Sequence, residues 1–211
     1  KKNLGFAGGN NLGVKEAKGD YLLFINNDTE VPSNFIEPLV ERMQSDKNIG
    51  VVSPKIRFHH TPDTIQFAGY TPMNYLTMRN SLIGYRQKDT GQFDVACESP
   101  FGHGAAMMIS REVIEKVGMM ADIFFLYYEE HDWFERIKKS GYTIWYEPKS
   151  LIYHKESIST GKESPMKIHY IARNRIVFLR RNVKGVKKAM AIIYQMFVAV
   201  PKNALMYLVK G

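Results

Sequence analysis

The 211-residue sequence is almost free of cysteine and has no long uninterrupted apolar run. Cys97 is its single cysteine, so no disulfide can form within it, and a reducing compartment fits this composition. The first thirteen residues are polar and glycine-rich, unlike a signal peptide. Internal repeats and low-complexity tracts are also absent. We therefore expect neither a disulfide-stapled module nor a repeat array, and we place the natural N-terminus upstream of Lys1.

The composition that is present suits one sizeable core. Hydrophobic residues make up 45% and charged residues 24%, with 12 Phe and 12 Tyr, which argues against disorder. The net charge of +8 favours anionic partners such as nucleic acid, acidic lipid or a phosphate-bearing substrate. Basic residues cluster late in the chain, at Arg173, Arg175, Arg180, Arg181, Lys184, Lys187 and Lys188. Alternatively, this basic cluster is an ordinary solvated surface without a partner.

Apolar patterning predicts an α/β domain over residues 1–163. The predicted strand 21–26 begins with five consecutive apolar residues and is bounded by polar residues, as in a buried strand of a parallel sheet. A helix opening at Pro32 and Ser33 and a strand at 50–53 complete a βαβ unit. Beyond it we expect an irregular or β-rich insertion over 55–100, a strand at 104–109, helices at 110–117 and 129–140, and strands at 142–146 and 151–153.

Residues 164–211 are expected to form basic, amphipathic C-terminal helices. The most apolar stretch, 186–209, is interrupted by Pro201-Lys202-Asn203 and therefore makes a poor membrane span. A helix lying in a membrane interface with basic flanks is one interpretation. A helix packed on the domain, or on a second subunit of a homodimer, is the other.

The glycine-rich segment 3–13 precedes a helical stretch to Ala17. Glycines before a helix let backbone N–H groups approach a phosphate, with help from the helix N-terminus. The same residues are ordinary turn formers. The spacing does not match a dinucleotide-binding fingerprint.

Polar residues follow the predicted strand 21–26. In open α/β sheets this end of a strand faces the ligand crevice. Asp28, with the amide oxygens of Asn26 and Asn27, could hold a hard cation that bridges a diphosphate, or could simply form an Asx turn. His154 ends a short apolar strand and is a candidate metal ligand only if the fold brings it near Asp28.

Three acids, Glu129, Glu130 and Asp132, open the helix 129–140 directly after four aromatic residues. Acids favour a helix N-terminus, but one or two would suffice for that. An aromatic enclosure can raise a carboxyl pKa and suit a general base. Because Glu130 and Asp132 point to nearly opposite sides of a regular helix, we expect one of them to transfer the proton. Trp133 is most simply a core residue.

Taken in order, these segments resemble family 2 glycosyltransferases, especially the bacterial rhamnosyltransferase-like and galactofuranosyltransferase-like branch. The resemblance runs from residue 3 to about residue 182. It rests on N-L-G-F-A-G-G-N-N-L-G, D-Y-L-L-F-I-N-N-D-T, G-A-A-M-M-I-S-R, F-F-L-Y-Y-E-E-H-D-W-F-E-R, G-Y-T-I-W-Y-E-P with Y-H, and A-R-N-R. It implies a GT-A fold, with a Rossmann-like, mostly parallel sheet flanked by helices. The family's first strands, which grip the nucleotide base, would precede residue 3.

The resemblance also implies roles. Asn26 and Asp28 take the first and third positions of the family's DxD metal motif, and His154 completes a site for Mg²⁺ or Mn²⁺. Glu130 matches the family's catalytic base, with one methylene more than the usual Asp, and Asp132 is the fallback. Gly104 would line the donor-sugar and acceptor side. The full set of expected substrate-binding residues is Asn3, Gly5, Gly9, Asn11, Asn27, Gly104, Glu129 and Trp133.

The expected activity is an inverting, metal-dependent transfer from a nucleotide-diphosphate sugar, dTDP-rhamnose or a UDP-sugar, to a saccharide or lipid-linked acceptor. We expect it to serve cell-surface polysaccharide synthesis at the cytoplasmic face of the membrane, with no nucleic-acid partner. Two alternatives stay open: a catalytically inactive nucleotide-sugar or carbohydrate-binding module, and a membrane-associated scaffold.

Overall fold

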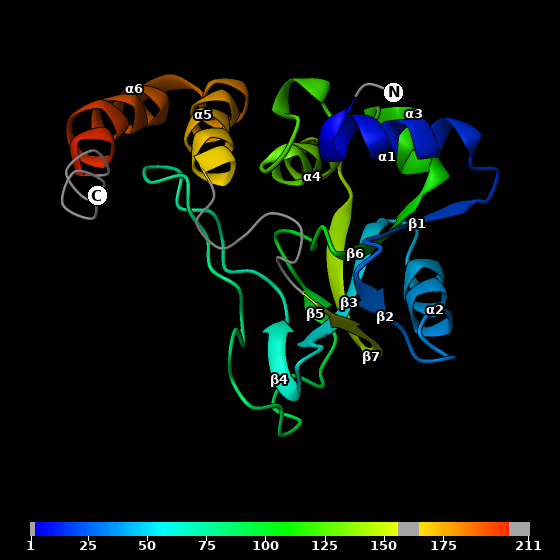
Figure 1. The fold of residues 1–211 in the computed structure, drawn as a ribbon. Helices are drawn as coiled ribbons and strands as arrows, with labels where there is room; N and C mark the ends of the chain where they lie inside the picture. Colours follow the sequence, from blue (N-terminus) through cyan, green and yellow to red (C-terminus); the bar gives the residue numbers. More distant parts are fainter. Residues whose placement is uncertain (1–2, 156–164, 203–211) are drawn as a thin grey trace.

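A computed structural model describes residues 3–155 and 165–202 of the chain (Figure 1). Within these residues a seven-stranded sheet has the order β1-β6-β3-β7-β2, with β4 beside β3 and β5 beside β7. The strands are β1 (Tyr21–Ile25), β2 (Thr29–Glu30), β3 (Ile49–Phe58), β4 (Thr61–Phe67), β5 (Cys97–Glu98), β6 (Ala106–Ser110) and β7 (Thr143–His154). The first four helices are α1 (Gly5–Glu16), α2 (Glu37–Ser45), α3 (Arg111–Val117) and α4 (Glu129–Lys139). The α/β class expected from the sequence is confirmed.

The strand directions differ from the expected, mostly parallel sheet. β3 and β7 are parallel, whereas β6 is antiparallel to both β1 and β3. β1 and β3 therefore run the same way, as a βαβ unit requires, but β6 lies between them. The reason is the insertion, which returns the chain to the carboxyl end of β1, where Ala106 pairs with Ile25. A strand that starts at that end must run backwards, so the sheet is mixed.

Short-range signals set several element boundaries as predicted. The Ser110 side chain caps α3 by accepting a hydrogen bond from the Val113 N–H at 3.3 Å. Gly118 then ends the helix with a φ of +82°. β7 is one strand rather than the two expected, because its pairing with β3 slips between Pro54 and Lys55 and absorbs the residues between the two predicted strands as a bulge.

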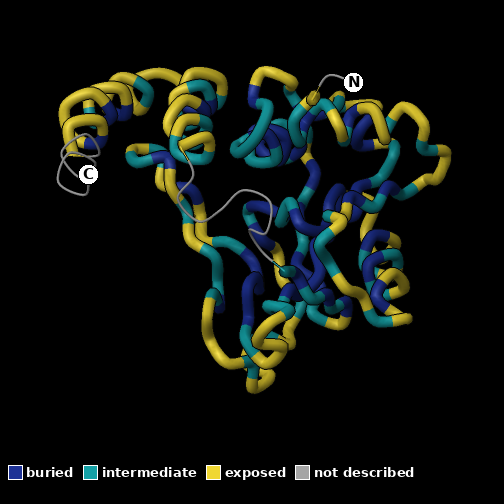
Figure 2. The backbone as a smooth tube through the Cα atoms, in the orientation of Figure 1, coloured by how far each residue is buried: buried dark blue, intermediate teal, exposed yellow. Residues whose placement is uncertain are grey.

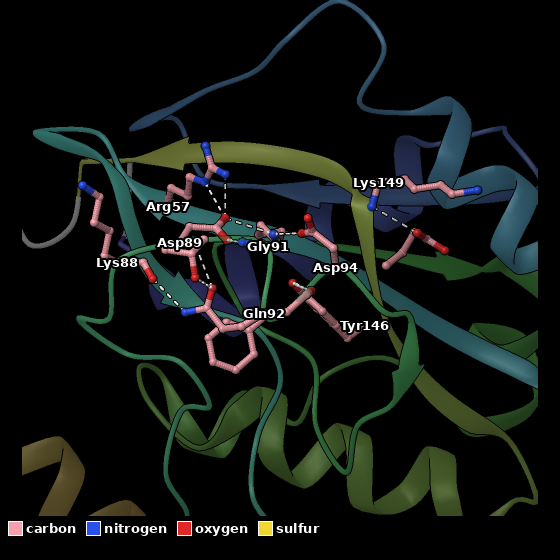
Figure 3. A network of polar contacts seen from close by, with 12 residues as sticks. Arg57, Lys88, Asp89, Gly91, Gln92, Asp94, Tyr146 and Lys149 are labelled. Atoms are coloured by element: carbon pink, nitrogen blue, oxygen red, sulfur yellow. Dashed lines mark hydrogen bonds and ion pairs between the residues drawn. The ribbon is translucent and has the colours of Figure 1, made fainter.

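The insertion is tied to β3 by a buried ionic network (Figure 3). The Lys55 side chain is 3% exposed and pairs with the carboxylates of Asp89, at 3.0 Å, and Asp94. Arg57 donates to the same Asp89 Oδ2 at 2.6 Å. Tyr146 of β7 adds a bond from its hydroxyl to the Phe93 carbonyl at 3.0 Å. Polar contacts therefore position a segment that has little regular structure.

The C-terminal helices share the core of the sheet domain. α5 (Pro165–Asn182) buries Phe178 and Leu179 in the cluster that contains Phe24 of β1 and Trp133 of α4. Figure 1 shows α5 beside α4 at the same end of the sheet. A domain boundary at residue 163 stays a prediction, but α5 packs as part of the first unit.

Helical backbone continues into the predicted break, as far as the last described residue. α6 (Gly185–Tyr194) leads into a π-helical turn, Gln195–Ala199, and helical backbone continues through Pro201 and Lys202. The wider π turn accommodates a proline, whose ring would otherwise clash with the preceding turn. Residues 203–209 of the predicted stretch lie outside the described residues. Across residues 3–155 and 165–202, no helix combines the length and apolar character needed to cross a bilayer.

Candidate active site

A cavity of about 410 Å³ lies where β1 and β7 end and α4 begins. The predicted residues Asp28, Glu130 and His154 all line it, although they are far apart in sequence. The other lining residues are Phe6, Asn26, Asn27, Gln66, Tyr70, Leu82, His103, Gly104, Ala105, Leu126, Tyr127, Glu129 and Lys167. The convergence expected from the sequence is therefore present in the fold.

Backbone pairing places Asp28 against His154. β2 pairs with the end of β7, with Thr29 opposite His154, and the Lys155 N–H donates to the Asp28 carbonyl at 3.0 Å. His154 Nε2 consequently lies 3.2 Å from Asp28 Oδ1. On the other side of the ring, Nδ1 is 3.0 Å from Oε1 of Gln66. Because this amide oxygen can only accept, Nδ1 carries a proton, and in the neutral ring the lone pair on Nε2 could bind a cation that Asp28 also contacts.

These two side chains fit a divalent cation. Asp28 Oδ1 is buried and accepts no hydrogen bond from the described residues. Two adjacent ligands of an octahedral ion, each about 2.1 Å from it, lie about 3 Å apart, close to the observed separation. Within the described part of the chain there is no cluster of three or more His, Cys, Asp or Glu side chains suited to a metal. The site therefore fits an ion that takes its other ligands from substrate phosphates and water, as Mg²⁺ commonly does.

Two neighbouring carboxyl groups also line the cavity. Glu129 is 2% exposed, and the Oε2 atoms of Glu129 and Glu130 are both buried without a hydrogen-bond partner among the described residues. Burial, together with the nearby Glu130 charge, raises the pKa of Glu129 far above its usual value, so Glu129 is protonated at neutral pH. A Cβ atom on Gly104 would lie 3.3 Å from Glu130 Oε1, so the glycine leaves room for this carboxylate. Glu130 is thus the carboxylate available to accept a proton.

Neutral histidines complete the enclosure. Burial lowers the pKa of His103 to about 3, with help from His154 and His131, and His103 Nδ1 accepts the Ala105 N–H at 3.0 Å. Burial also lowers the pKa of His131. Sequence reasoning missed Gln66, Tyr70, His103 and Lys167 as lining residues. His103 adjoins the Gly104 motif and could have been suspected, whereas Gln66 reaches the site only through the pairing of β4 with β3.

The glycine-rich segment is not a loop before a helix, because its residues 5–13 form most of α1. Among its residues Phe6 lines the cavity, while the predicted Asn3, Gly5, Gly9 and Asn11 do not. Asn11 is a structural bridge, since its amide donates to the Met120 carbonyl at 2.9 Å and its oxygen accepts the Met120 N–H at 3.1 Å.

Tertiary contacts explain why this helix starts so early. Gly5 has a φ of +70°, and a Cβ there would overlap the Phe125 carbonyl. That carbonyl accepts the Phe6 N–H at 2.7 Å. Asn3 accepts the Gly5 N–H at 2.9 Å, and Gly9 faces open space. The glycines therefore allow α1 to approach the segment before α4.

Asp132 and Trp133 lie in the interior rather than at the cavity. Asp132 is fully buried and accepts hydrogen bonds from Arg181 Nε and Asn182 Nδ2, both at 2.8 Å. Burial alone would raise its pKa, but the bonds from Arg181 and Asn182 outweigh it and hold that pKa low. Trp133 is also fully buried, and its indole N–H donates to the Gly118 carbonyl at 2.7 Å. The first turn of α4 directs Glu130 into the cavity and these two side chains away from it.

Known proteins resemble the chain in sequence. Residues 1–118 match the family model for glycosyl transferase family 2. The low-salt glycan biosynthesis hexosyltransferase Agl10 of Haloferax volcanii is 28% identical over 183 residues, which cover 83% of this chain and 57% of that protein. The dTDP-rhamnosyl transferase RfbF of Shigella flexneri is 24% identical over 194 residues, covering 86% of this chain and 62% of that protein. The chain thus spans about three fifths of these relatives.

Solved structures resemble the fold. GalNAc-T7 with UDP, GalNAc and Mn²⁺ aligns over 85% of this chain and 35% of its own, with a TM-score of 0.63 and 19% identity. The mannosyltransferase PcManGT from Pyrobaculum calidifontis, with GDP-Man and Mn²⁺, aligns over 92% and 51%, with a TM-score of 0.51 and 15% identity. Both are GT-A glycosyltransferases, and at these identities they establish the fold alone.

Proposed function

The chain belongs to glycosyl transferase family 2, and we propose that its cavity transfers a sugar from a nucleotide-diphosphate sugar to an acceptor hydroxyl with inversion at C1. The observation that carries the proposal is the placement of Asp28, His154 and Glu130 around one cavity at the carboxyl end of β1. In α/β sheets this is where ligands bind. A dTDP- or UDP-linked sugar and a saccharide or lipid-linked acceptor of a surface polysaccharide are the substrates we propose.

The proposed reaction uses two groups of lining residues, and the first is the acid pair of α4. Glu130 accepts the proton of the acceptor hydroxyl while the oxygen of that hydroxyl forms a bond to C1 of the donor sugar. The bond from C1 to the diphosphate oxygen breaks on the opposite face, and the nucleoside diphosphate leaves. Glu129 is protonated and therefore does not compete for this proton. His103 and His131 have lowered pKa values and are neutral, so they add no positive charge near the Glu130 carboxylate.

The second group of lining residues would serve the leaving group. Asp28 and His154 would hold a divalent cation, Mg²⁺ or Mn²⁺, with Asn26 as a further oxygen ligand, and a cation bound there neutralises charge on the departing diphosphate. Gln66 fixes the His154 ring by accepting its Nδ1–H at 3.0 Å. Lys167 lines the same cavity and adds a positive charge to it.

A ligand-binding experiment tests this function. Full-length protein is heated with UDP, dTDP or GDP, each with and without Mn²⁺. A nucleotide present at 100 times its dissociation constant stabilises by about 2.7 kcal/mol, which raises the melting temperature by about 5–10 °C. We expect this shift to need Mn²⁺ and to disappear in Asp28→Asn, with nucleotide-sugar turnover in the wild type. Binding with no turnover of any nucleotide sugar would instead identify an inactive binding module.

We also propose that α6 rests on the anionic inner face of the cytoplasmic membrane. Val186, Met190, Ile193, Phe197 and Val200 recur at helical spacing and are 54–76% exposed, and we name them the α6 apolar face. In Figure 2 much of α6, at its place in Figure 1, has the colour of exposed residues. The exposed Lys184, Lys187 and Lys202 flank this face, as in helices that bind acidic lipid.

Vesicle sedimentation tests this surface. We expect the full-length protein to bind vesicles of phosphatidylcholine with phosphatidylglycerol more tightly than pure phosphatidylcholine, and less tightly at high salt. The double variant Ile193→Glu, Phe197→Glu should lose this binding. Val95→Glu, at an equally exposed apolar residue in the insertion, should keep it. If the wild type instead forms a dimer and does not bind lipid, and the double variant is monomeric, the α6 apolar face binds a second copy of the chain.

A further inference from the structure

The segment that leads into α4 has an unusual backbone. Phe125, Tyr127 and Tyr128 have positive φ values of +56°, +67° and +73°, which bulky residues rarely adopt. Such a conformation persists only where surrounding contacts hold it in place. Because α4 begins directly after Tyr128, this turn sets where Glu129 and Glu130 enter the cavity.

One buried side chain of α5 holds the turn. Asn174 is fully buried, and its Nδ2 donates toward three backbone carbonyls: Phe124 and Leu126 at 2.7 Å each, and Tyr127 at 2.8 Å. The three carbonyls of this positive-φ turn thus converge on one nitrogen. An amide nitrogen has two hydrogens, so it is shared among the three carbonyls. The Phe124 carbonyl also accepts the Leu126 N–H, so loss of Asn174 would chiefly leave the part-buried carbonyls of Leu126 and Tyr127 without this donor.

The neighbours of Asn174 fix its orientation. Arg173 Nη1 donates to Asn174 Oδ1 at 2.6 Å and to the Ile123 carbonyl at 2.8 Å. The amide oxygen is therefore directed at the guanidinium, and Nδ2 must face the turn. Arg175 Nε lies 3.2 Å from the Tyr128 hydroxyl, so it contacts the same segment from the next position.

We propose that the A-R-N-R segment of α5, residues 172–175, is a clamp that positions the catalytic base, with Asn174 as its central positioning residue. This inference rests on the proposed role of Glu130. Asn174 acts through the turn 124–128 and does not line the cavity. Through this contact α5 would affect catalysis, although it lies late in the chain.

The clamp predicts a separation between binding and turnover. In Asn174→Ala, the turn loses its shared donor and Glu130 shifts, so we expect kcat to fall about 100-fold, because misplacement by about 1 Å has effects of that size. Binding of UDP or dTDP with Mn²⁺, measured by calorimetry, should stay within about twofold, since Asp28 and His154 are untouched. Asn174→Ser keeps one donor and should retain an intermediate kcat.

Asn182→Ala is the matched control. Asn182 lies on the same helix two turns further on and donates to Asp132, away from the cavity. Hydrogen exchange of the full-length protein gives a readout that needs no activity: amides 124–131 should exchange faster in Asn174→Ala and not in Asn182→Ala. If exchange changes as expected but the wild type transfers no sugar, the clamp stands and the proposed function fails. Wild-type kcat in a folded Asn174→Ala, equal losses in both variants, or failure of both Asn174 variants to fold would each overturn the positioning role.

Discussion

Neighbouring acids on α4 should respond in opposite ways to loss of charge. Glu130→Gln removes the proposed proton acceptor but breaks no observed hydrogen bond at Oε2, which is unpaired among the described residues. General-base catalysis contributes about 10²–10⁴-fold, so kcat should fall by that factor while the melting temperature changes little.

Asp132→Asn should do the reverse. Asp132 pairs with Arg181 at 2.8 Å and Arg136 at 3.2 Å, and the variant leaves both cations without their counter-charge. Breaking a buried ion pair costs about 3–5 kcal/mol. Because the Arg181 side chain is 39% exposed and water can solvate it, we discount this to about 2 kcal/mol. For a chain of this size the melting temperature should then fall by about 4–8 °C.

The assay measures both quantities on each variant. Thermal unfolding by circular dichroism gives the melting temperature, and release of nucleoside diphosphate below that temperature gives kcat per folded molecule. We expect kcat of Asp132→Asn to remain within about threefold of the wild type. A folded Asp132→Asn that has lost turnover, alongside an active Glu130→Gln, would show that the base has been assigned to the wrong acid.

Three further changes have defined outcomes. Gly104→Ala places a methyl group 3.3 Å from the Glu130 carboxylate, so steady-state kinetics should show kcat about 10-fold lower with nucleotide binding retained, and an unchanged kcat would contradict the close approach. Glu129 has a raised pKa when folded, so wild-type stability declines as pH rises above the ordinary value near 4.5. Glu129→Gln should therefore gain melting temperature over the wild type more at pH 8 than at pH 5, and a pH-independent difference would argue against a protonated carboxyl. Asp89 is held at a lowered pKa by Lys55 and Arg57 despite burial, so its contribution is present above pH 3.8 and is lost as pH falls further. Asp89→Asn should unfold about 3 kcal/mol more easily at pH 7, and in urea titrations this difference should shrink toward pH 3.

The cavity could be anticipated where local pattern and fold rules agree. A buried strand ending in Asn26-Asn27-Asp28 has its carboxyl end at the ligand crevice, and three acids after aromatic residues indicate an enclosed helix start. The regular α-helix also separates Glu130 from Asp132, which is how the structure divides them. These predictions needed no knowledge of distant contacts.

The features that sequence reasoning missed depend on long-range contacts. The glycine-rich segment forms a helix because Asn11 and Phe6 bond to residues more than a hundred positions away. β6 runs antiparallel because of where the insertion ends. Gln66 orients His154 across 88 positions. Asn174 gives no local sign that it holds the turn before α4. Helical and strand periodicity cannot encode such pairings.

Anomalous diffraction at the manganese edge, from crystals of the full-length protein grown with UDP or dTDP and Mn²⁺, tests the central arrangement most directly. Our account predicts an anomalous peak between Asp28 Oδ1 and His154 Nε2, with the diphosphate completing the ion's coordination and Glu130 facing it across the cavity. A manganese peak elsewhere, with the nucleotide bound away from Asp28 and His154, would contradict it.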